Sequence, residues 1–286
     1  NKDKIVGITP TMPNEVEEVN PADFYDIISF ALDGNPLDFR GIQFFKFYSK
    51  IHKEYEKTLK LIKPADAIAE YLLNGKKFTL DETYTSNLAL NVILGVEVDE
   101  SIKKLIERIN EDGSVYRSNR KEVSGLLIDE ALAGEALLTM YQNTFDEKYL
   151  NLALKIYDWV EKNLADSLGF RDCKPENELT KRQVYEPLAN SELAIFLAKL
   201  WAITNEEKYL NDAKKAMNIA YTVGQDIRVL SRVAIAYTKI NELIRSKVRV
   251  NDDIRVEVVK DNGCQDDEFR FGDKCYKNLE EIKSNL

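Results

Sequence analysis

The stretch Thr144-Phe-Asp-Glu-Lys-Tyr-Leu-Asn-Leu-Ala153 recurs 60 residues later as Thr204-Asn-Glu-Glu-Lys-Tyr-Leu-Asn-Asp-Ala213. Each copy follows a segment that is apolar nearly all round, such as residues 125–141, and opens one in which apolar residues recur every three or four positions. The first pattern is typical of a buried helix and the second of a helix with one face in water. Helical solenoids and α/α toroids are built from such repeated pairs.

Helical periodicity continues on both sides of the repeat. We expect helices over residues 23–32, 42–62, 64–73, 81–94 and 99–109 ahead of it, and one from residue 224 to 244 after it. The total is nine or ten helices, short of the twelve of a complete six-hairpin ring. After Lys247 the period falls to two, which predicts a β-hairpin with Asn251-Asp252-Asp253 as its turn.

The predicted fold class is therefore all-α: an α/α toroid, six-hairpin-like but incomplete, with short β segments at both ends. Residues 1–20 form an expected extended segment, with a strand running from Lys4 to Pro10. Residues 21–246 form the toroid, and residues 247–286 a small β-hairpin tail. Because Asn1 is not an initiator Met, we expect the chain to be trimmed or to be a piece of a longer protein.

The charge balance excludes several classes of partner. Among 286 residues, 49 Asp+Glu outweigh 40 Lys+Arg, which argues against nucleic acid and against an anionic membrane surface. The most apolar run, Leu193 to Ile203, is too short to span a bilayer and carries Lys199 in its middle. The single histidine, His52, cannot supply a histidine metal cage or a catalytic triad, and we expect it at the surface. We expect no metal and no cofactor.

The cysteines bear on the cellular compartment. Cys173, Cys264 and Cys275 form no C-x-x-C pair, and the N-terminus has no secretory signal, so we expect a reducing, cytoplasmic setting. Whether Cys264 and Cys275 pair stays open, because spacing in sequence does not show how close two Cα atoms lie.

Four segments together resemble the helical half of a known family, the spermatogenesis-associated, thioredoxin-domain-containing proteins. They are Gly113-Ser-Val-Tyr-Arg-Ser118, Leu126-Leu-Ile-Asp-Glu-Ala131, Asp146-Glu-Lys-Tyr-Leu150 with Ala153, and Tyr185-Glu-Pro-Leu-Ala-Asn-Ser191. The family joins an N-terminal thioredoxin-like domain to an α/α toroid similar to six-hairpin glycosidases and N-acylglucosamine 2-epimerases. The resemblance implies a toroid, and Cys264 and Cys275 loosely match its paired-cysteine tail.

The chain departs from this family in two ways. It has no redox C-x-x-C, so thioredoxin activity is not implied, and beyond His52 it has no counterpart of the epimerases' catalytic histidines. Ile8-Thr-Pro-Thr11 followed by residues 24–32 is similar to the last strand and helix of a thioredoxin-like domain. An N-terminal thioredoxin-like domain is therefore one possible partner.

The repeat also predicts a site. Asp129 lies one turn into an apolar helix beside Glu130, and Asn190 follows 60 or 61 residues later, with Glu186 and Tyr185 about one turn before it. We expect these side chains at similar depth around one axis. Carboxylates ~5–10 Å apart can divide acid and base roles in glycosidic chemistry. We predict Asp129 and Glu186 as catalytic residues and Glu130, Asn190 and Tyr185 as ligand-binding residues.

Two arginines belong to the predicted site, and the acidic residues also have a structural interpretation. Arg117 and Arg182 precede the inner helices and form an expected clamp for a carboxylate or phosphate, or else pair with nearby acidic residues. The alternative for the acidic residues is structural: Asp129 and Glu186 would interact with helix N-terminal dipoles, while Asn190 would satisfy neighbouring backbone groups.

These observations lead to two hypotheses for function. The first is binding or processing of a carbohydrate-like small molecule in the central cup of the toroid. The second is a catalytically inert helical scaffold for a protein partner, which a missing sixth hairpin would favour because an open ring exposes helix edges.

Overall fold

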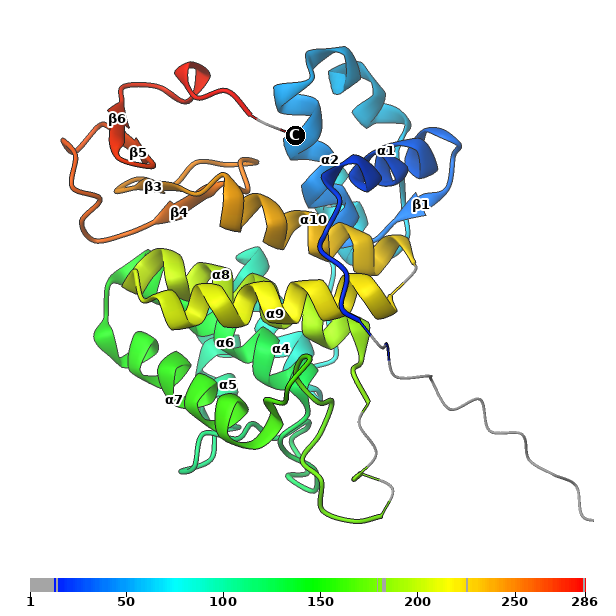
Figure 1. Cartoon of the computed structure of the whole chain (residues 1–286), viewed down its shortest axis with the longest axis vertical. Helices are drawn as coiled ribbons and strands as arrows, with labels where there is room; N and C mark the ends of the chain where they lie inside the picture. The colour runs from blue at the N-terminus through cyan, green and yellow to red at the C-terminus, as the bar shows by residue number, and fades with distance from the viewer. Residues whose placement is uncertain (1–12, 14, 179, 182–183, 225, 285) are drawn as a thin grey trace, which may run out of the picture.

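The computed structural model describes residues 13, 15–178, 180–181, 184–224, 226–284 and 286 (Figure 1). The predicted strand over residues 4–10 lies outside them. The described part is mostly helical with a small C-terminal sheet, which confirms the predicted fold class. Its α-helices are α1 (Tyr25–Leu32), α2 (Phe39–Ile51), α3 (Ala67–Asn74), α4 (Thr85–Leu94), α5 (Val98–Ile106), α6 (Leu127–Thr144), α7 (Glu147–Leu164), α8 (Pro187–Thr204), α9 (Glu207–Val223) and α10 (Ile227–Asn241).

The repeated sequence forms two similar pairs of helices, α6 with α7 and α8 with α9. The inner members, α6 and α8, are buried along nearly their whole length, whereas α7 and α9 bury one face. Each inner helix ends at a residue in the left-handed conformation, Phe145 (φ 53°) and Asn205 (φ 59°). This ends the helix and turns the chain back, so that each amphipathic helix packs beside its inner one, as Figure 1 shows for α8 and α9.

Five of the described helices form an inner array. In this array α4 packs beside α6, α6 beside α8, α8 beside α10, and α10 beside α2. The helices α3, α5, α7 and α9 pack on its outside. The arrangement is that of an open α/α toroid. The inner helix that comes first in the chain, α2, lies at one end of the array, beside α10, the inner helix that comes last.

The prediction of one long helix over residues 42–62 is wrong. The α-helix ends at Ile51, and a 3₁₀-helix, η2 (Lys53–Leu61), follows. The interruption is at His52, whose backbone (φ −109°, ψ 82°) is not helical. His52 is half-buried rather than exposed, since its ring packs 4.3 Å from that of Tyr48.

The predicted tail hairpin is also wrong in its pairing. β3 (Ile244–Ser246) and β4 (Val256–Val258) are parallel, and residues 247–255, including the expected turn, form the loop between them. β3 also pairs antiparallel with β5 (Phe269–Phe271), which pairs with β6 (Lys274–Tyr276). The sheet order is therefore β4-β3-β5-β6. A second, minimal sheet joins β1 (Pro36–Leu37) to β2 (Lys63–Pro64) in parallel.

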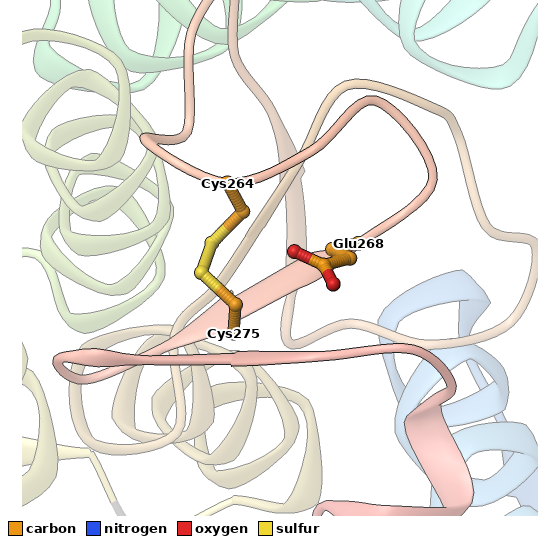
Figure 2. A group of neighbouring side chains, drawn as sticks. All are labelled: Cys264, Glu268 and Cys275. Carbon is orange, nitrogen blue, oxygen red and sulfur yellow. A yellow bond between two sulfur atoms is a disulfide. The ribbon is translucent and has the colours of Figure 1, made fainter.

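A disulfide joins strand β6 to the loop between β4 and β5. Cys264 and Cys275 are bonded, with their Cα atoms 5.9 Å apart, and the Glu268 side chain lies beside them (Figure 2). In this bonded form the two sulfur atoms offer no thiolate to a metal ion. None of the described helices combines the length and apolarity needed to cross a bilayer.

Candidate functional site

Asp129 lies in the first turn of α6, at the wall of a pocket. Its side chain is buried, and no group in the described part of the chain hydrogen-bonds its Oδ2 atom. The pocket measures about 250 Å³ and lies where the N-terminal ends of α4 and α6 meet; it is lined by Tyr84, Ser86, Asn87, Arg117, Ile128 and Asp129. Burial raises the pKa of Asp129 to about 7, opposed by the Arg117 charge and assisted by that of Asp172. An acid of this kind holds its proton close to neutral pH.

Glu130, the next residue, is fully buried, and one of its carboxyl oxygens accepts a hydrogen bond from the backbone. The Val115 N–H donates to its Oε1 at 2.7 Å, while its Oε2 has no hydrogen-bond partner within the residues that the structure describes. Burial raises the pKa of Glu130 well above its ordinary value, although the Val115 hydrogen bond opposes the change. Two consecutive residues of α6 thus each carry a buried carboxyl oxygen that no described residue hydrogen-bonds.

Asp172 does not line the pocket but lies close enough to influence the charge of Asp129, and the sequence did not reveal it. Its backbone carbonyl accepts a 2.9 Å hydrogen bond from the Leu127 N–H, which fixes it beside the start of α6. Burial raises its pKa, and the Arg117 charge opposes this. Arg117 therefore lies within electrostatic reach of both Asp129 and Asp172. The loop around Asp172 has no helical period, so spacing in sequence gave no signal for it.

The other predicted residues lie at the start of α8 and make contacts within the protein. The Glu186 carboxylate caps α8 by accepting from the Ala189 N–H. Asn190 is fully buried and bonds both backbone groups of Phe170, accepting from its N–H at 3.1 Å and donating to its carbonyl at 2.8 Å. The Tyr185 hydroxyl donates to Asp166. Catalytic and ligand-binding roles for these residues stay predictions.

The structure thus brings together only part of the predicted set. Asp129 and Arg117 share the pocket, and Glu130 is the neighbour of Asp129 in α6. Glu186, Asn190 and Tyr185 do not line it. Arg182 lies outside the described residues.

A buried ion network across the inner helices was also missed. Arg40 on α2 donates to Glu135 on α6 at 2.5 Å and to Glu192 on α8 at 2.6 Å. Arg232 on α10 binds Glu192 at 2.7 Å and Asp38 at 2.6 Å. Although burial opposes its ionisation, Arg40 together with nearby lysines lowers the pKa of Glu135. The partners are far apart in sequence, so no local motif indicates them.

Comparison with solved structures finds similar chains, and one of them is a glycosidase. The chain is similar to a solved α-mannanase of glycoside hydrolase family 76 from Bacteroides thetaiotaomicron, with 13% identity over 79% of this chain and 85% of that one. The TM-score is 0.36, which is too low to transfer site residues from that protein to this chain. No protein-family model and no curated protein matches the chain. The resemblance to the thioredoxin-domain-containing family thus finds no support in these comparisons.

Proposed function

We propose that the protein binds, and processes, a neutral carbohydrate-like small molecule in the pocket around Asp129. One observation carries the proposal: Asp129 Oδ2 and Glu130 Oε2 are buried carboxyl oxygens without hydrogen-bond partners among the described residues. Buried polar atoms are nearly always paired, and exceptions often mark functional groups. Asp129 also lines a pocket, where the hydroxyl of a ligand would supply the missing partner.

The charges around the pocket support a neutral ligand. Among the described residues that line the pocket, Arg117 is the one cation, and its charge already acts on Asp129 and Asp172, so no unmatched cation is left for an anionic sugar. A protonated Asp129 would donate to a ligand oxygen as a general acid. The half-buried Asp172 is the partner carboxyl group that the electrostatics favour, in place of the predicted Glu186. Two carboxyl groups in different environments can divide acid and base roles.

A ligand screen tests this proposal against the inert-scaffold alternative. The melting temperature is measured with a panel of neutral mono- and oligosaccharides for wild type, Asp129→Asn and a control, Asp158→Asn. Asp158 is an exposed aspartate on the outer helix α7. We expect at least one sugar to stabilise wild type and the control but not Asp129→Asn. No response to any sugar, or an equal response in Asp129→Asn, would favour the scaffold.

A further inference from the structure

A second cavity lies inside the inner array and has a different chemistry. It measures about 250 Å³, and all five inner helices contribute to its wall. It shares no lining residue with the Asp129 pocket. The loop between β3 and β4 borders it as well. The wall carries both cations and carboxylates, among them Arg40, Lys199, Arg249, Glu135 and Glu257.

Lys199 provides the unusual feature of this cavity. It lies on α8, within the apolar run Leu193 to Ile203, and is only 8% exposed. Its ammonium group donates to Thr139 Oγ1 at 3.0 Å, and the nearest carboxylate oxygen, on Glu135, is 3.9 Å away. An ammonium group has three N–H donors. Lys199 therefore lines the cavity with donors that no hydrogen bond to the described residues occupies.

Each of the four described carboxylates that line the cavity is paired with a cation other than Lys199. Asp252 is bound by Lys46 at 2.9 Å, and Asp253 by Arg255 at 2.8 Å. Glu135 is bound by Arg40 at 2.5 Å. Glu257 is bound by Lys239 at 2.5 Å, and the Gln142 amide donates to its other oxygen at 2.7 Å. Each carboxylate thus has a nearer partner than Lys199, which leaves this ammonium as a buried cation of the wall that no described carboxylate hydrogen-bonds.

Arg249 supplies a second cation at the mouth. It lies in the loop between β3 and β4, is exposed, and donates one hydrogen bond, to the Asn143 side chain. Within the described residues no ion pair joins Arg249 to a carboxylate. A molecule entering the cavity would therefore meet one exposed and one buried cation.

We propose that this cavity binds a small carboxylate or phosphate anion, with the Lys199 ammonium as its inner contact and the Arg249 guanidinium at its mouth. Oxyanions are the ligands that such cations bind with short, charge-assisted hydrogen bonds. Burial lowers the pKa of Lys199, although Glu257 and Glu135 oppose the change, and a bound anion would further stabilise its charged form. The site does not depend on Asp129.

Calorimetric titration with inorganic phosphate and, separately, with malonate tests the proposal at constant ionic strength set with chloride. The two probes distinguish a phosphate from a carboxylate ligand. The proteins are wild type, Lys199→Met, Arg249→Ala and a control, Lys214→Met, which removes an exposed lysine of α9. Asp129→Asn is included to separate this site from the proposed sugar pocket.

We expect saturable binding of at least one probe to wild type, Lys214→Met and Asp129→Asn. Binding should weaken by at least about tenfold in Lys199→Met, because a buried charge contact is lost, and by less in Arg249→Ala. No saturable binding of either probe to wild type, or equal affinity in Lys199→Met, overturns the proposal. If Lys199→Met does not fold, as judged by circular dichroism, the exposed Arg249→Ala variant decides: unchanged affinity there also overturns it.

Discussion

Lys199 donates a 3.0 Å hydrogen bond to Thr139, the residue 60 positions earlier in the chain. The two residues hold the same position in the two copies of the repeat, so α6 and α8 lie side by side in matching register. Glu130 and Asn190 are also 60 residues apart, and each binds the backbone of the loop ahead of its helix, at Val115 and Phe170. Equivalent positions in sequence thus have equivalent depth in the array.

Asp129→Asn should stabilise the protein at high pH. The pKa of Asp129 is raised from 3.8 to about 7 in the folded state, so the folded protein holds a proton that the unfolded chain releases. Stability from this group is complete below pH 4 and is lost as the pH rises to 7. At about 1.4 kcal/mol per pKa unit, the loss is up to about 4 kcal/mol by pH 8.

Denaturant unfolding at pH 4 and pH 8 measures this effect. The gain in unfolding free energy of Asp129→Asn over wild type should grow by about 2 to 4 kcal/mol between the two values. The exposed Asp158→Asn control should show little change. A gain that is the same at both pH values would contradict a proton held by Asp129.

Asn190→Ala should destabilise the fold. The change leaves the N–H and carbonyl groups of Phe170 unpaired in a buried position, at a cost of about 2 to 4 kcal/mol. Asn241→Ala is the matched control, because Asn241 is exposed and bonds the Tyr237 carbonyl at the end of α10. The control should cost about 0.5 kcal/mol or less. Equal losses in the two variants would show that Asn190 does not hold this loop.

Arg40→Met should be among the most damaging changes to the inner array. It removes the nearest cation from two buried carboxylates, Glu135 and Glu192. We expect this to lower the free energy of unfolding by about 3 to 5 kcal/mol. Arg228→Met removes an exposed ion pair with Asp226 and should cost about 1 kcal/mol or less. Unfolding in urea measures both, and similar losses would show that the buried network contributes little.

Replacing both Cys264 and Cys275 by serine should loosen the tail alone. The bond closes a loop with a sequence separation of 11, and removing such a constraint costs about 3 kcal/mol in the chain-entropy account. Hydrogen exchange should speed up at the amides of β5 and β6, with α6 and α8 unchanged. Unaltered exchange in both strands would show that the tail holds its pairing without the disulfide.

The parts of the fold that the sequence predicts are those with a local period. The repeat locates α6 to α9 and, through its register, relates Asn190 to Glu130. Lys199 also stands out in sequence as a charge in an apolar run, the signal of its buried position. Asp129 was found for the same reason, as a carboxyl group in an apolar helix.

The features that sequence does not predict depend on contacts between distant segments. Arg40 and Glu192 are 152 residues apart, and no local pattern joins them. The alternating residues after Lys247 predict a strand, but the pairing of β3 with β4 in parallel is decided by packing against α8 and by β5. Asp172 is held near the pocket by a hydrogen bond from the Leu127 N–H to its carbonyl, which is a contact between a loop and the start of a helix.

The proton on Asp129 is the most direct test of the proposed site. Carbon-13 NMR of the aspartate carboxyl groups, with the Asp129 signal assigned by its loss in Asp129→Asn, gives the pKa of this group in the folded protein. We expect a value of about 7. A value near 3.8, the ordinary one for aspartate, would contradict it.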